Sequence, residues 1–224
     1  MTTSLPEEFL LIAYADDGTP LTDGTHLDNG LGGAVLLELA LAGRVDIADK
    51  KVIALNGHPT GDPLVDDAAD RIAGEPKPRK PGHWVSKFAK DTRPLVLDKL
   101  VADGVLTMRT DKVLGLFPRK KFPSAYGVEP PAETEARQRM WAAVASSGAV
   151  DPRTAALCAL VSATDLDRKV FADLDRRAVK ARLKEISEGA WAAQAVKKTI
   201  EEIQTAVMVA IVASTTAATA GSSS

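Results

Sequence analysis

The chain has 224 residues, which suits one large domain or two small ones, and its 45% hydrophobic and 26% charged residues are the balance of a soluble globular protein. This composition excludes a wholly disordered chain, a collagen and a coiled coil, and the net charge of −2 argues against a globally basic nucleic-acid-binding protein. A single cysteine, Cys158, excludes a disulfide framework, and an aromatic content of only 4% favours helices over a β-sandwich.

The first half of the chain alternates predicted helices and turns. Ser4 and Glu7 form a capping box that opens a short helix through Ile12. A helix that is apolar nearly all round follows over 31–43, so we expect it to be central and buried, with Gly43 as its C-cap. The other elements predicted here are a β-hairpin over 44–55, a helix over 62–72 with Asp62 as its N-cap, and a proline-rich loop over 74–82.

The second half is predicted to be mostly helical. Its elements are a helix over 84–102 broken at Pro94, a second β-hairpin over 105–117, helices over 133–146, 151–163 and 191–213, and a helix over 165–187 that is broken or bent inside. The apolar run at 206–213 is about half of the length needed to cross a bilayer, so we interpret it as a buried core helix. The expected fold class is mainly α: a single helical domain over residues 1–213, with a buried central helical core, amphipathic outer helices and two small β-hairpins, followed by a flexible tail over 214–224.

The two hairpins are predicted to be related. Residues 43–55 align with residues 104–116 at a constant offset of 61, and each copy follows an apolar helix that ends at glycine. A helix, a glycine and a two-stranded hairpin form the second half of a winged-helix unit. The alternative is that any helix followed by a glycine and a hairpin produces such a match.

Positive charge is concentrated between Lys77 and Lys121. This segment holds 12 lysines and arginines and four aspartates, a net charge of +8, whereas the other residues hold 16 basic and 26 acidic side chains. Such polarity is typical of a face that meets an anionic partner, although a solvated surface would have the same composition.

The end of the second predicted hairpin combines aromatic and basic side chains. Three cations lie between two phenylalanines, and the membrane-contacting residues that we predict are Leu116, Phe117, Arg119, Lys120, Lys121 and Phe122. Aromatic rings that enter a membrane interface beside cations that meet lipid headgroups form a peripheral membrane contact. The same chemistry would suit a nucleic-acid-binding wing, and an inward-folded Phe117 beside solvated cations is a third interpretation.

Catalytic motifs are absent from the sequence. It contains no His-Glu-x-x-His, no Gly-x-Ser-x-Gly and no Walker loop. The three histidines, His26, His58 and His83, are scattered, and Cys158 sits in an apolar run that is typical of core packing. We therefore expect no catalytic residue, no metal site and no cofactor, and we predict that the protein is not an enzyme.

Five segments of the chain stand in a recognisable order and spacing. They are Leu5–Leu11, Gly30–Arg44, Thr60–Asp66, Leu100–Leu106 and Ala155–Asp165. Together they resemble the Golgi phosphoprotein 3 family, including its bacterial, actinomycete-like members. The resemblance covers nearly the whole chain and implies a mostly helical single domain with a projecting hydrophobic hairpin. It also implies peripheral membrane association, binding of phosphatidylinositol 4-phosphate on a basic face, and recruitment of glycosyltransferases through their cytosolic tails.

The resemblance further implies a lipid headgroup site. The family's pocket combines a tryptophan, an arginine in a Gly-Leu-Arg-Gly motif, and two arginines three residues apart, and Lys90 and Arg93 fall at this last pair. Arg93 matches, whereas Lys90 keeps the charge without the guanidinium fork. Gly32 stands where the motif has its arginine, and the tryptophan position falls near Asp23, an acid that would repel phosphate.

The leading hypothesis is a cytoplasmic, non-enzymatic, peripherally membrane-associated protein that binds anionic phospholipid, with an adaptor role towards the cytosolic tails of membrane enzymes. The alternative is a winged-helix-like module that binds nucleic acid or protein. The two phenylalanines, the family resemblance and the lack of a polar recognition helix at 31–43 favour lipid, so nucleic acid is not expected as a partner. The N-terminus carries two acids and no basic region, which argues against a signal peptide.

Overall fold

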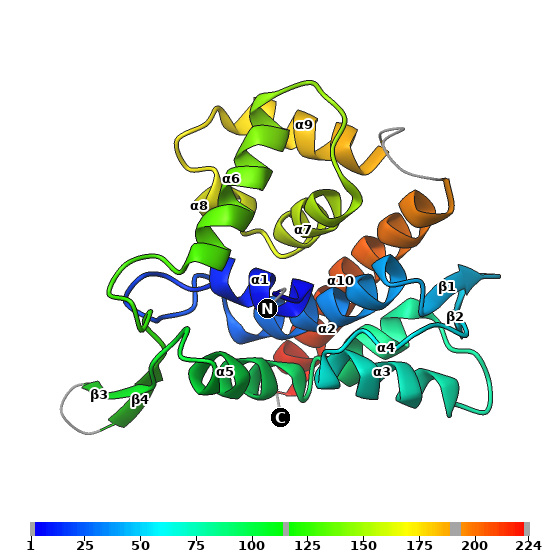
Figure 1. Cartoon of the computed structure of the whole chain (residues 1–224), viewed down its shortest axis with the longest axis horizontal. Coiled ribbons are helices and arrows are strands. Elements are labelled where there is room, and N and C mark those ends of the chain that lie inside the picture. Colours follow the sequence, from blue (N-terminus) through cyan, green and yellow to red (C-terminus); the bar gives the residue numbers. More distant parts are fainter. Residues whose placement is uncertain (1–2, 114–116, 189–193, 222–224) are drawn as a thin grey trace.

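The computed structural model describes residues 3–113, 117–188 and 194–221, and within these ranges the chain forms ten helices and two antiparallel hairpins (Figure 1). The mainly α fold class is therefore confirmed. The helices are α1 (Leu5–Ile12), α2 (Gly24–Leu41), α3 (Pro63–Ala73), α4 (Pro81–Phe88), α5 (Thr92–Ala102), α6 (Pro131–Ala145), α7 (Pro152–Ala163), α8 (Asp167–Val170), α9 (Arg176–Glu188) and α10 (Gln194–Gly221). The strands are β1 (Val45–Ala48) and β2 (Lys51–Ala54), which form one hairpin, and β3 (Arg109–Val113) and β4 (Phe117–Lys121), which form the other.

The helices α2 and α10 pack against each other at the centre of the molecule, and α10 also contacts α4 and α7 (Figure 1). Gly33 of α2 allows this close approach, because a Cβ atom there would lie 2.4 Å from the Cγ2 atom of Val207. Ile200, Ile203 and Val207 bury their side chains on the inner face of α10. The predicted buried central core is thus built from the glycine-containing helix and the C-terminal helix together.

The outer helices bury one face each, as their amphipathic patterns predicted. In α3, the buried residues are Val65, Ala68, Ala69 and Ile72, whose spacing of three and four places them on a single stripe. The predicted caps are also confirmed. Ser4 donates its backbone N–H to the Glu7 carboxylate at 2.7 Å, and the Asp62 and Asp151 side chains accept hydrogen bonds from the first turns of α3 and α7.

Two of the predicted helix boundaries were wrong. The central helix begins at Gly24 rather than at residue 31, because the Asp23 carboxylate caps it by accepting hydrogen bonds from the backbone N–H groups of Thr25 and His26. The helix predicted over 84–102 is interrupted at residues 89–91 rather than at Pro94. Pro94 lies in the first turn of α5, where a proline removes no intrahelical hydrogen bond.

The internal similarity between 43–55 and 104–116 is real at the helix ends but fails in the hairpins. Gly43 and Gly104 both have left-handed backbones, with φ of 65° and 71°, and the N–H of the next residue donates to the carbonyl five residues earlier, Arg44 to Leu39 and Val105 to Leu100. The second hairpin, however, occupies 109–121 rather than 105–117. Residues 105–107 instead pair with the return segment at 123–125, which moves the two strands towards the C-terminus.

The C-terminal helix α10 contains a stretch, Lys197–Ala217, that is long and apolar enough to cross a membrane by length and composition. In the structure this stretch packs on α2, α4 and α7 through one face, which buries Ala206, Val207, Ala210 and Ile211. Met208, Val209 and Val212 are exposed, so the interpretation of residues 206–213 as a buried core helix holds for that face and is wrong for the other. The helix continues to Gly221, beyond the expected domain end at residue 213. The domain boundary and the flexibility of residues 214–224 stay predictions.

Candidate anion-binding surface

The second hairpin carries the exposed cations that the sequence analysis singled out. It extends away from the helices in Figure 1, and its register pairs Asp111 with Arg119 and Thr110 with Lys120. Arg119 and Lys120 are exposed, and neither forms an ion pair with any residue that the structure describes, whereas Lys121 lies 2.9 Å from Asp17 and 3.4 Å from Asp111. Among its described side chains the hairpin therefore presents three cations without an ion pair, Arg109, Arg119 and Lys120, whereas Lys121 joins its base to the body.

The two phenylalanines that flank these cations lie at opposite ends of β4. The Phe117 backbone pairs with Val113 at the turn end of the hairpin, and Leu116 lies outside the residues that the structure describes. Phe122 lies at the base, where its ring packs edge-to-face on Tyr14 with 6.4 Å between ring centroids. Its backbone N–H donates to the Gly18 carbonyl at 2.9 Å, so Phe122 is part of the joint between the hairpin and the body.

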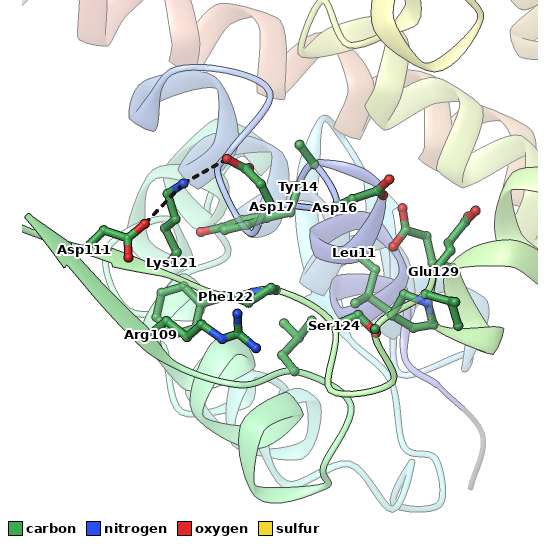
Figure 2. A pocket seen from close by; sticks show the side chains of 17 residues that line it. Leu11, Tyr14, Asp16, Asp17, Arg109, Asp111, Lys121, Phe122, Ser124 and Glu129 are labelled. Atoms are coloured by element: carbon green, nitrogen blue, oxygen red, sulfur yellow. Dashed lines mark hydrogen bonds and ion pairs between the residues drawn. The ribbon is translucent and has the colours of Figure 1, made fainter. Parts of the chain in front are cut away.

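A cleft of about 430 Å³ opens beside this joint (Figure 2). Figure 2 shows Lys121 between Asp17 and Asp111 at one side of the cleft, with Asp16 and Glu129 at the other. The residues that line it come from the end of α1, the base of the hairpin and the segment before α6, and include Leu11, Tyr14, Asp16, Asp17, Arg109, Asp111, Lys121, Phe122, Ser124, Glu129 and Glu133.

Glu133 is the most perturbed carboxyl group of this cleft. Burial raises its pKa to about 7, although the charge of Arg137 and the hydrogen bonds from it oppose the shift. The guanidinium of Arg137 lies 2.7 Å from Glu133 and 3.1 Å from Glu129. The cleft thus mixes both signs of charge and lacks the uniform positive potential of an anion site.

The second predicted cationic site, Lys90 and Arg93, lies where α4 passes into α5. Lys90 is exposed in the turn between the two helices and has no ion pair within the described chain. Arg93 is about one-third exposed and binds Asp28 of α2 through two contacts, Nε to Oδ1 at 2.9 Å and Nη2 to Oδ2 at 3.2 Å. Lys90 is free to meet an anion, whereas Arg93 already holds one.

The described residues offer little to redox or metal chemistry. No group of three or more His, Cys, Asp or Glu side chains in the described part of the chain is arranged to hold a metal ion. Cys158 is buried in α7, and burial raises the pKa of its thiol to about 12, so the reactive thiolate does not form near neutral pH.

Residues 5–203 match the family model described as Golgi phosphoprotein 3 (GPP34). This match covers most of the chain and includes both hairpins and the Lys90–Arg93 turn. The chain belongs to the Golgi phosphoprotein 3 family. The resemblance expected from five sequence segments is therefore confirmed.

The structure explains both departures from the pocket that the resemblance to the Golgi phosphoprotein 3 family implies. At Gly32, a Cβ atom would lie 2.3 Å from the Val85 carbonyl oxygen, so α4 crosses α2 where the motif has its arginine. Asp23, near the expected tryptophan, caps α2, and its carboxylate also contacts His26 at 2.6 Å. An arginine cannot replace Gly32 without moving α4 away from α2.

Sequence reasoning missed Asp28, Tyr14 and Asp17, the partners of the basic and aromatic residues that it selected. Asp28 is 65 residues from Arg93 along the chain, and Asp17 is 104 residues from Lys121. No local pattern marks such pairs. The only available signal was the helix period of α2, which would have put Asp28 on a partly exposed face had the helix been predicted to begin at Gly24.

Proposed function

We propose that this Golgi phosphoprotein 3 family member is a non-enzymatic peripheral membrane protein that binds anionic phospholipid headgroups from the cytoplasmic side. The observation that carries the proposal is the second hairpin, where Arg119 and Lys120 are exposed and unpaired among the described residues. A lysine or arginine near an anionic leaflet contributes about 1 kcal/mol of attraction. The hairpin extends from the body, so these cations reach a flat surface before the helices do.

The backbone register of Phe117 and the ring contact of Phe122 support separate roles for the two ends of the hairpin. Phe117 is placed by its register at the turn end, beside the predicted contact residue Leu116, so these two are the residues that would enter the interface. Phe122 packs on Tyr14 and would hold the hairpin at the body. We accordingly assign membrane insertion to the turn end of the hairpin and anchoring to its base.

Lys90 and Arg93 are proposed as the headgroup site, with phosphatidylinositol 4-phosphate as the lipid that family membership favours. An adaptor role towards the cytosolic tails of membrane enzymes is proposed on the same ground. The winged-helix alternative loses its main support, because the two hairpins differ in register after their shared glycine caps.

Sedimentation with vesicles tests the proposal. Binding should rise with the phosphatidylserine content of phosphatidylcholine vesicles and fall with salt, since the Debye length is about 8–10 Å near physiological ionic strength. Replacing Arg119, Lys120 and Lys121 with serine should weaken binding roughly 30-fold, from about 1 kcal/mol for each of the unpaired cations Arg119 and Lys120, and flatten the salt dependence.

A matched control separates the hairpin from net charge. Lys180, Lys184 and Lys198 are exposed cations of α9 and α10, and serine at these three positions removes the same charge away from the hairpin. The control variant should bind vesicles almost as the parent does. Equal loss in the two triple variants, or equal binding to neutral and acidic vesicles, would contradict the proposal, and a gel shift with DNA would then test the alternative partner.

A further inference from the structure

The ion pair between Arg93 and Asp28 has the geometry of an anion already bound. Arg93 projects from the first turn of α5 and Asp28 from α2, and both carboxylate oxygens meet the guanidinium, at 2.9 and 3.2 Å. The side chains are 34% and 28% exposed, so the pair stands at the surface within reach of solvent. A phosphate group uses the same two-point contact with arginine, because its O–P–O edge matches the fork of donors as a carboxylate does.

We infer that Asp28 is an internal competitor for phosphate at Arg93. Its carboxylate occupies the donors that a phosphate group would use, so it lowers the affinity of the site and sets the threshold at which a phosphate ligand binds. This inference rests on the proposed function, and it adds a residue that controls that function.

The surroundings of Arg93 leave room for an exchange of partners. Gly24, at the start of α2, presents no side chain to the guanidinium, and even a Cβ atom there would be 3.8 Å from Nη2. Lys90, three residues before Arg93 and exposed, supplies a second positive charge that no described residue neutralises. An incoming phosphate would therefore meet one free cation and one cation that must first release Asp28.

The environment of Asp28 weakens its hold on Arg93. Burial raises the pKa of the Asp28 carboxyl group, and the neighbouring Asp23 adds to this effect, although the charge of Arg93 opposes it. Arg93 thus offsets only part of the effect of burial on this carboxyl group. A phosphate monoester carries more negative charge than the Asp28 carboxylate, so it can displace this carboxylate from Arg93.

The test compares Asp28→Asn with a variant of equal charge. Asp91→Asn removes one negative charge two residues from Arg93, but Asp91 contacts Arg71 at 3.7 Å instead of Arg93. The probes are phosphatidylcholine vesicles that contain phosphatidic acid, and soluble glycerol phosphate, so that a lipid headgroup and a free phosphate are measured separately. Asp28→Asn should raise the affinity for phosphate about three- to tenfold, and Asp91→Asn should raise it less.

A double variant shows whether the gain acts through Arg93. Asp28→Asn with Arg93→Gln removes both charges together, so it leaves no unpaired carboxylate, and the gain should disappear. If Asp28→Asn does not fold, Asp28→Ser removes the same charge without an amide against the guanidinium and is interpreted in the same way.

The outcomes separate this inference from the proposed function. Equal gains in Asp28→Asn and Asp91→Asn, or a gain that survives in the double variant, would overturn the role of Asp28 while vesicle binding by the parent still supports the membrane role. A gain with glycerol phosphate alone would support the role of Asp28 and overturn the membrane role. No binding of either probe by any variant would overturn both.

Discussion

The two hairpins leave their helices in the same way and then diverge. Gly43 and Gly104 both end a helix with a left-handed residue, yet β1–β2 lies against the body and β3–β4 extends away from it (Figure 1). In the first hairpin Val45, Ile47 and Val52 are buried. In the second, Arg109, Thr110, Arg119 and Lys120 are exposed.

The difference shows that the side chains after the cap decide where a hairpin goes. Alternating apolar residues give β1 a face to bury, and the Val52 N–H is further bonded to the Arg79 carbonyl at 2.8 Å. Lysines and arginines cannot be buried without partners, so the described cations of the second hairpin stay in solvent, and those contacts with the body that the structure describes lie at its base. The same type of glycine cap thus precedes both the buried hairpin β1–β2 and the exposed hairpin β3–β4.

The largest expected difference between the hairpins is in folding stability. Ile47→Ala in β1 should lower the free energy of unfolding by about 2–4 kcal/mol, because it removes buried methyl groups and leaves a cavity. Thr110→Ala in β3, an exposed position, should change it by no more than about 0.5 kcal/mol. Urea unfolding of both variants gives the comparison, and equal effects would show that the second hairpin is also part of the core.

Substitutions of Phe122 and Phe117 should separate an effect on folding stability from an effect on vesicle binding. Phe122→Ser should destabilise the protein by about 1–2 kcal/mol, less than for a fully buried ring, because its partly buried ring packs on Tyr14 and the core. Phe117→Ser should instead weaken vesicle binding while leaving its salt dependence intact. Thermal melts and sedimentation at two salt concentrations measure these effects. A Phe117 variant that melts well below the parent and binds vesicles normally would mean that this ring is structural.

The pH dependence of stability should report on the base of the second hairpin. The folded pKa of Glu133 is about 7, above the ordinary value of 4.5, so its contribution is fully present below pH 4.5 and is lost as the pH rises through 7. Glu133→Gln should therefore gain stability relative to the parent between pH 5 and pH 8, by about 1–2 kcal/mol. Glu135→Gln, an exposed site on the same helix, is the control. A Glu133 variant that loses stability relative to the parent over this range would contradict the assigned protonation.

The smallest effects on stability should come from substitutions of the glycine that precedes each hairpin. Gly43→Ala and Gly104→Ala should each cost about 1–2 kcal/mol, since a left-handed backbone disfavours a Cβ atom. At both positions the space around that atom is open to 4 Å, so the cost is conformational only. Calorimetry should give two similar decreases in melting temperature. A much larger loss at one glycine would show that its cap has a second function.

The sequence predicted the helices well because several helices begin at residues that cap their first turn. Ser4 with Glu7, Asp62 and Asp151 each satisfy backbone N–H groups of the helix that they begin, so these starts are visible in the sequence. The start of α2 was missed because glycine and asparagine within 24–30 are weak helix formers, and contacts with α1 and α10 override that preference.

The candidate site was only partly accessible to the same reasoning. The excess of cations between Lys77 and Lys121 needed no structure to be seen. The two phenylalanines look alike in the sequence, and only the tertiary structure shows that the Phe122 ring packs on Tyr14. The partner of Arg93 could not be found, because a contact between α2 and α5 depends on how the whole bundle packs.

The packing of α10 against α2 has a consequence for the order in which the protein is made. The groove at Gly33 is complete only when Val207 fills it, and a ribosome adds roughly 5–20 residues each second. The apolar face of α2 therefore leaves the ribosome on the order of ten seconds or more before its partner exists. During that interval the nascent chain exposes the surface that later becomes its core, and a chaperone that binds apolar segments has its best opportunity to act.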